Sequence, residues 1–419
     1  MDWEEAKQLT DKVLQLKTLL DNPQENENLD EIAIEYNELR QKLLTELENH
    51  THGGYGGEVK SYINAGVFTR DELVKKGLVH PRERMEPQCL PALEQFMAHP
   101  NFEAKKECTD IYFFGSPAAG RLCLLMGIIG ADGYGYSINF REKGGPEAMA
   151  LKRYLWEGVG PKATPGKYVN TINASIVEKL DDKGGFVDHH VNFVRMSGEE
   201  FAYKIANNDD TVCLRDMGDG INVLLRNSNR KVFFIVIDPT IEILRFDYFR
   251  EVLDENGNVT DVEPIAEYIC QQSCISKFVS LFECEENKAF MRQVDAIHFI
   301  ITKADTLGKT QEERNNKAHD LLMDKYRGAV YSLIHYCRRT KRINRTTGFQ
   351  PRIFTFSLGK FYLDGYEYDS KDSLYLIDAL RHMTQGTKES KGLRKMFGHA
   401  TAVVQPSPGD YGVKINIDE

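Results

Sequence analysis

The stretch DIYFFGSPAAGRLCLLMGII, residues 110–129, decides the fold. Its aromatic and β-branched start predicts a short strand over residues 111–114, and the apolar run that begins at Leu122 predicts a helix. Gly115 and Gly120 lie between them with the spacing G-x-x-x-x-G. Such a loop favours phosphate binding, because backbone N–H groups and the helix N-terminus point at an anion. The same pattern is also typical of a simple tight turn.

The two residues that follow the loop depart from the usual phosphate-binding sequence. Arg121 stands where a lysine reaches the phosphates, and Leu122 stands where a serine or threonine hydroxyl holds magnesium. A guanidinium still pairs well with phosphate oxygens, whereas a leucine side chain offers no oxygen to a metal ion. The candidate phosphate-binding residues are Gly115, Ser116, Pro117, Ala118, Ala119, Gly120, Arg121 and Leu122.

Further apolar runs follow at intervals along the chain. They are VNFVRMSG from residue 191, KVFFIVID from residue 231, DAIHFIIT from residue 295 and PRIFTFS from residue 351. Stretches of helical composition separate them. Continuously apolar strands that alternate with helices predict an α/β fold, with a mostly parallel sheet and helices on both faces.

Two of these strands end in motifs that point to a nucleotide. TKAD, residues 302–305, resembles the guanine-specificity motif N/T-K-x-D, and SLGK, residues 357–360, stands where GTPases have a base-contacting S-A-K loop. Residues 108–385 therefore resemble a divergent P-loop GTPase of the translation-factor and Ras class with a degenerate Walker A loop. The resemblance implies a GTP or GDP site, with a carboxylate that accepts two hydrogen bonds from guanine. The base-binding residues that it implies are Thr302, Lys303, Asp305, Ser357 and Leu358.

The resemblance also implies switch residues. Thr164, in PKATP, is a candidate for the first switch, although a threonine between two prolines is also typical of a turn. RMSG begins at Arg195 and ends at Gly198, where the family has D-x-x-G, so the magnesium-binding aspartate of that motif is missing. Asp216, in a second possible frame, and Asp238, at the end of a strand, are the remaining carboxylates with a possible metal role.

Loss of both magnesium-binding positions implies impaired hydrolysis, and it makes magnesium a doubtful cofactor. Arg121 and Arg195 are then expected to pair with phosphate oxygens. No catalytic residue is assigned. The resemblance extends to GTPase-like components of bacterial multi-protein conflict systems, which implies a regulatory or assembly role. Two alternatives remain: an active GTP hydrolase with an unconventional metal site, and a scaffold that binds no ligand.

The remainder of the chain divides by composition. Apolar residues at helical spacing predict two helices that form a coiled-coil-like hairpin over residues 1–50, and residues 51–107, with four prolines, read as a helical connector. Residues 386–419 form a polar tail, which either adds an edge strand or stays loose. Other protein subunits are the expected partners, through the hairpin or through the insertion at residues 131–163.

Composition excludes several classes of function. The net charge of −10 over 419 residues argues against general nucleic-acid binding. The eight cysteines include no C-x-x-C pair, so we expect reduced thiols and no metal site. The longest apolar run, residues 122–131, is about half of a membrane span, and we expect a cytoplasmic protein that does not enter a membrane. His189 and His190 are expected to be structural.

Overall fold

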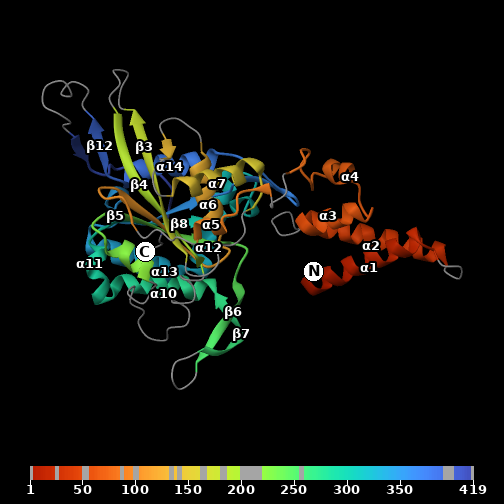
Figure 1. Cartoon of the computed structure of the whole chain (residues 1–419). Coiled ribbons are helices and arrows are strands. Elements are labelled where there is room, and N and C mark those ends of the chain that lie inside the picture. The colour runs from red at the N-terminus through yellow and green to blue at the C-terminus, as the bar shows by residue number, and fades with distance from the viewer. Residues whose placement is uncertain are drawn as a thin grey trace. The chain divides into compact units, whose positions relative to one another are not determined.

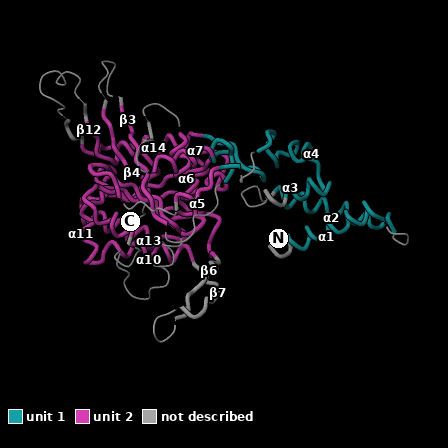
Figure 2. The backbone as a smooth tube through the Cα atoms, viewed as in Figure 1, with its two compact units in different colours: residues 1–90, 154–160, 359–369 teal, residues 91–153, 161–358, 370–419 magenta. Residues whose placement is uncertain are grey.

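The computed structural model divides the chain into two compact units (Figure 2). Unit 1 comprises residues 1–90, 154–160 and 359–369, and unit 2 comprises the rest. The residues that the structure describes are 3–23, 28–49, 56–84, 89–97, 103–131, 136–138, 144–160, 168–179, 186–198, 219–253, 259–389 and 401–416.

Unit 1 is helical and carries one small hairpin. Its elements are α1 (Trp3–Asp21), α2 (Leu29–Asn49), α3 (Gly56–Asn64), α4 (Arg70–Lys75), β10 (Gly359–Tyr362) and β11 (Gly365–Tyr368). Apolar side chains from all four helices form a single core, which includes Val13, Leu44, Tyr62 and Leu73. Arg40 of α2 pairs with Glu72 of α4 beside this core.

The hairpin β10–β11 completes unit 1, although it lies about 280 residues further along the chain than the helices it joins. Leu363, at its tip, is buried in the helical core and donates its N–H to the carbonyl oxygen of Leu78 at 2.8 Å. The N–H of His80 donates to Asp364 Oδ1 at 2.9 Å, and Arg84 Nη2 donates to the carbonyl oxygen of Tyr366 at 2.6 Å.

Unit 1 therefore differs from the boundaries expected from the sequence. Residues 56–79 share one core with the first two helices and do not form a connector between domains. The four prolines of residues 51–107 made this stretch look irregular, and the closing hairpin comes from a part of the sequence that gives no local sign of belonging there.

Unit 2 contains the large sheet (Figure 1). Its strands are β1 (Thr109–Phe114), β2 (Tyr136–Ile138), β3 (Val169–Lys179), β4 (Phe186–Met196), β5 (Arg230–Ile237), β6 (Ile243–Leu253), β7 (Val259–Cys270), β8 (Val294–Ile301), β9 (Arg352–Thr355), β12 (Gly386–Glu389), β13 (Thr401–Val404) and β14 (Val413–Lys414). Its helices are α5 (Glu94–Met97), α6 (Arg121–Gly130), α7 (Gly145–Glu157, whose end belongs to unit 1), α9 (Asp219–Arg226), α10 (Gln271–Ser280), α11 (Lys288–Met291), α12 (Gln311–Lys325), α13 (Arg327–Thr340) and α14 (Lys371–Met383).

The strands expected from the apolar runs are confirmed, and they are neighbours in the order β4-β1-β5-β8-β9. Every pair in this series is parallel. β3 pairs antiparallel with β4 along its whole length, and this strand was not among those expected from the apolar runs. β6 and β7 form a separate two-stranded sheet that was not predicted either.

Helices cover both faces of the sheet (Figure 1). On one face, Phe114, Phe233 and Phe299 pack against α10 and α13 through residues such as Phe278 and Leu333. α6 and α14 contact each other on the other face, where Gly127 leaves room for Phe356 and Leu358, which follow β9, and for Ser373 of α14. The expected α/β architecture is thus confirmed.

The C-terminal tail contributes edge strands, one of the two outcomes that its sequence allowed. β12 pairs antiparallel with the start of β4 and with β13, and β14 pairs antiparallel with β9. Tyr411, just before β14, is buried and its hydroxyl lies 2.6 Å from Thr346 Oγ1.

Candidate functional site

The candidate residues lie where the parallel strands end. The loop 115–120 follows β1, Asp238 follows β5, Thr302 follows β8 and Ser357 follows β9. Since carboxyl ends of parallel strands meet at the same edge, these segments meet at one edge of the sheet, where α/β proteins commonly bind ligands.

The loop that follows β1 has the backbone of a tight strand-to-helix connection. Ala118 and Gly120 have positive φ angles of 58° and 77°. A Cβ on Gly115 would meet the carbonyl oxygen of Val236 at 2.6 Å, so only glycine fits against the neighbouring strand. Gly120 ends the loop as the residue before α6, and its Cα faces Thr302.

Thr302 joins this loop to the TKAD motif. Its side chain is buried, and its hydroxyl donates to the carbonyl oxygen of Ala119 at 2.8 Å. Its N–H donates to the carbonyl oxygen of Ile237 at 3.0 Å. The two motifs, 182 positions apart between Gly120 and Thr302, are therefore in direct contact.

A buried glutamine, Gln271 at the start of α10, connects the loop to its surroundings. Its Oε1 accepts from Ser116 Oγ at 3.2 Å and from the N–H of Asp238 at 3.0 Å. Its Nε2 donates to the carbonyl oxygens of Asp238 and Ile241, each at 2.9 Å, and lies 3.0 Å from the hydroxyl of Tyr326. Sequence reasoning missed Gln271, because no motif marks a glutamine that acts at such a distance along the chain.

Lys303 and Asp238 form an ion pair with 2.6 Å between Nζ and Oδ2. The carboxylate of Asp238 is fully buried, and its Oδ1 accepts from the N–H of Thr240 at 2.8 Å and from Thr240 Oγ1 at 2.7 Å. Lys303 itself adopts a left-handed backbone, with φ of 48°. Both oxygens of Asp238 thus have partners within the protein.

Asp305 and Ser357 of the two base-binding motifs meet. Ser357 Oγ donates to Asp305 Oδ1 at 2.9 Å, and the N–H of Ser357 donates to Asp372 Oδ2 at 2.9 Å. Asp305 is half-buried, so an edge of its carboxylate reaches the surface. Leu358 is buried beside Gly127 of α6 and cannot contact a ligand with its side chain.

Arg121 lies at the start of α6 against the turn that follows β4. Its Nη1 is 3.5 Å from the carbonyl oxygen of Ser197, and its Nη2 abuts Gly198. Burial lowers the pKa of Arg121 to about 10, which leaves the guanidinium charged at neutral pH. Among the described residues, no carboxylate forms an ion pair with it.

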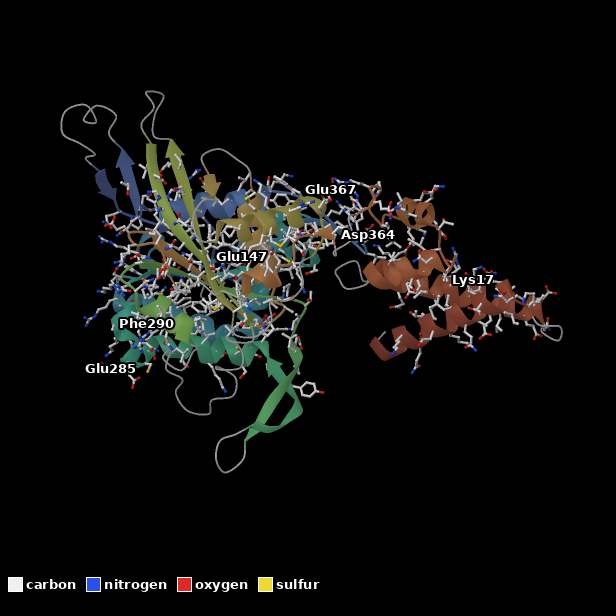
Figure 3. All side chains as sticks on the ribbon, in the orientation of Figure 1. Lys17, Glu147, Glu285, Phe290, Asp364 and Glu367 are labelled. Carbon is white, nitrogen blue, oxygen red and sulfur yellow. The ribbon has the colours of Figure 1, made fainter. Side chains whose placement is uncertain are left out.

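Arg195 has a different environment from the one the sequence suggested. Its guanidinium pairs with Glu147 of α7, which is labelled in Figure 3, and both side chains are almost fully buried. Tyr168 and Asn170 of the β3 strand region both donate to Glu147 Oε2, and Arg195 also lies over the ring of Tyr168 at 4.7 Å. Burial lowers the pKa of Arg195 to about 9. This cation is already neutralised inside the protein.

Of the three remaining candidate residues, the structure describes one. Leu122 is half-buried in the first turn of α6, whereas Thr164 and Asp216 lie outside the described residues. Within the part of the chain that the structure describes, no group of three or more His, Cys, Asp or Glu side chains is placed to hold a metal ion.

The two adjacent histidines face opposite sides of β4. His189 is buried with its Nδ1 3.0 Å from Thr384 Oγ1, and burial lowers its pKa. The His190 ring is partly exposed, with its Nδ1 3.0 Å from Ser175 Oγ. Neither lies beside a described nucleophile of the candidate site.

None of the described helices has the length and apolar content needed to cross a bilayer.

Comparison with known proteins adds no family to this description. No protein-family model matches the chain, and a search of curated proteins found no match.

Proposed function

We propose that residues 108–385 form a guanine-nucleotide-binding domain of the P-loop GTPase type with impaired hydrolysis. The observation that carries the proposal is the junction of two motifs that were identified independently: the hydroxyl of Thr302 donates to Ala119 at 2.8 Å. A phosphate-binding loop and a guanine-binding motif must be neighbours if one nucleotide is to contact both. The parallel order β4-β1-β5-β8-β9 further supports this assignment, because each motif follows a strand in the sequence that the resemblance requires.

Asp305 is the residue assigned to the base. Its carboxylate accepts from Ser357 through Oδ1, which fixes the orientation of the group. A carboxylate is the acceptor that the N1–H and N2–H groups of guanine require. Adenine presents no such pair of donors. This geometry favours guanine over adenine.

Impaired hydrolysis follows from the chemistry of the residues at the magnesium positions. Leu122 offers no oxygen, and Arg195 is held by Glu147. Asp238, the alternative metal ligand, has both carboxylate oxygens engaged by Lys303 and Thr240. Phosphoryl transfer in this family depends on a magnesium ion that bridges the phosphates. We therefore propose a regulatory or assembly component of a multi-protein system.

Exposed apolar residues support partner binding by this component. Met149 of α7, in the insertion, is 58% exposed, and Ile34 of α2 is 61% exposed. We propose that these two elements contact other protein subunits.

A variant that changes the preferred base from guanine to xanthine tests the proposal. Asp305→Asn replaces one acceptor with a donor, which matches the N1–H and O2 of xanthine and opposes the N2–H of guanine. By calorimetric titration, we expect the variant to bind GDP at least about tenfold more weakly than the native chain does, and to bind xanthosine diphosphate more tightly. Asp324→Asn, the same change at an exposed position of α12, should leave both affinities unchanged. Equal loss of both nucleotides in Asp305→Asn, or no binding of GDP by the native chain, counts against the proposal.

A ligand-free scaffold is the second candidate. The buried Arg195–Glu147 pair favours it, because a cation that would otherwise face phosphates is satisfied without one. A thermal-shift titration that shows no stabilisation by GTP, GDP or ATP, with or without magnesium, would select the scaffold.

A further inference from the structure

We infer that the site is selective for a nucleoside diphosphate over a triphosphate and binds it without magnesium. The inference rests on the proposed function and specifies the ligand of the same site. It depends on three features: the closure of the loop by Gly198, the pairing of the neighbouring cations, and the chemistry at the magnesium positions.

The turn after β4 closes the loop on the side that Arg121 faces. A Cβ on Gly198 would lie 2.6 Å from Pro117 Cα and would overlap Arg121 Nη2, so the backbone of this turn rests directly on the loop. The residue at the position of Arg121 is the one that reaches the β- and γ-phosphates in P-loop proteins. Ser197 and Gly198 therefore occupy the side of the loop where the outermost phosphate would extend.

In the described part of the chain, few unpaired positive charges lie near the loop, so they can balance only a small negative charge on a ligand. Lys303 is paired with Asp238, and Arg195 is paired with Glu147, so each contributes no net charge. Arg121 forms no ion pair within the described residues and remains the charge available to phosphates. A triphosphate brings about one more negative charge than a diphosphate, and leaving a charge unpaired in a partly buried site costs free energy.

Magnesium cannot supply the missing charge in the usual way. Its protein ligands are oxygens, and the two family positions carry the side chains of Leu122 and Arg195. One guanidinium at Arg121 and the backbone N–H groups of the loop thus balance two phosphates better than three.

The test compares GDP, GMP and a non-hydrolysable GTP analogue by isothermal titration calorimetry on the full chain, with and without magnesium. We expect GDP to bind at least about tenfold more tightly than the GTP analogue, because one phosphate is left without a charge partner. We expect magnesium to change neither affinity by more than about twofold. A GTP analogue that binds as tightly as GDP, or a strict requirement for magnesium, would overturn the inference and leave the proposed function standing. If no guanine nucleotide binds at all, both fail.

An Arg121→Gln variant tests whether Arg121 contacts the phosphates of GDP, and its affinity for GMP serves as the control for a correctly folded site. Loss of the guanidinium should weaken GDP by about tenfold and leave GMP unchanged, because GMP lacks the phosphate that Arg121 reaches. The GMP affinity thus reports on whether the variant site is intact. Arg338→Gln, at an exposed position of α13, removes the same charge far along the sequence and should change neither. Equal weakening of GDP and GMP in Arg121→Gln, or no effect on GDP, would contradict the role of Arg121.

Discussion

Single residues in this protein have partners that differ from those that the resemblance implies. Arg195, where the resemblance expects a magnesium-binding aspartate, lies in a buried cluster with Glu147, Tyr168 and Asn170. A buried guanidinium is tolerated only with such partners, because taking a charge out of water is costly. Arg195 therefore has its carboxylate partner on α7, outside the motif.

A buried histidine gives a residue-scale prediction of pH dependence. His298 on β8 is fully buried, its Nδ1 accepts from the N–H of Arg352 at 3.1 Å, and burial lowers its pKa to about 3. The unfolded chain binds a proton near pH 6.5 and the folded chain does not, so stability is lost as pH falls below about 6.5. We expect this group to remove about 2 kcal/mol of unfolding free energy between pH 7 and pH 5.

Urea denaturation at the two pH values measures this loss. His298→Gln cannot take up the proton, so its loss between pH 7 and pH 5 should be smaller than that of the native chain by this amount. The exposed His335→Gln variant should lose as much as the native chain. Identical pH dependence in native chain and His298→Gln would show that the histidine is not held neutral.

At the scale of elements, the site is assembled by contacts between loops that follow different strands. The apolar runs predicted β1, β4, β5, β8 and β9 because buried parallel strands are continuously apolar. The same reasoning missed β3, whose residues Asn170, Thr171 and Asn173 are polar although buried. Their side chains bond to other polar groups, such as Asn192 beside Asn173, and these long-range partners leave no periodic signal.

The candidate site was predictable to a similar extent. The contact between the loop and TKAD followed from the order of strands and motifs, since both occupy the carboxyl end of the sheet. The sequence did not predict the contacts that Gln271 and Glu147 make, or the contact of Gly198 with the loop. Each acts through a contact with a residue that is distant in sequence, and only the folded chain brings them together.

Gln271 provides the element-scale prediction, because it links the loop to the segment that follows β5 and to Tyr326, which lies between α12 and α13. Gln271→Leu would leave the hydroxyl of Ser116 and the N–H of Asp238 without their acceptor, and buried groups of this kind cost about 1–3 kcal/mol each. We expect a drop of about 2 kcal/mol or more in unfolding free energy, and weaker GDP binding because the loop is no longer held. Denaturation and calorimetry measure the two effects.

The neighbouring Gln272 supplies a matched control, since it is exposed on the same helix. Gln272→Leu should change stability by less than about 0.5 kcal/mol and leave GDP binding intact. Equal behaviour of the two leucine variants would contradict the role assigned to Gln271.

At the scale of the whole molecule, unit 1 is built from three separate stretches of chain. Two of them flank candidate site segments in the sequence: residues 154–160 precede the stretch with Thr164, and residues 359–369 follow Leu358 directly. Composition alone suggested a hairpin and a connector. It could not reveal this division, because the hairpin that completes the core lies far along the chain.

Asp364, which is labelled in Figure 3, accepts from the N–H of His80, and its replacement tests how the hairpin β10–β11 stabilises unit 1. Asp364→Ala removes the acceptor of a backbone N–H, so we expect faster hydrogen–deuterium exchange over α3 and α4. Exchange over β1 and β8 should be unchanged, since they belong to unit 2. Asp11→Ala, an exposed change on α1, serves as the control. Equally faster exchange in both units would show that they do not unfold independently.

The central claim is that this chain binds a guanine nucleotide without magnesium and without ordinary turnover. Calorimetric titration of the full chain with GDP and ADP in the presence of EDTA, together with a phosphate-release assay with GTP and magnesium, tests it most directly. The account predicts saturable binding of GDP, at least about tenfold weaker binding of ADP, and no phosphate release above background. Binding that requires magnesium, or GTP turnover that Asp305→Ala abolishes, would contradict it.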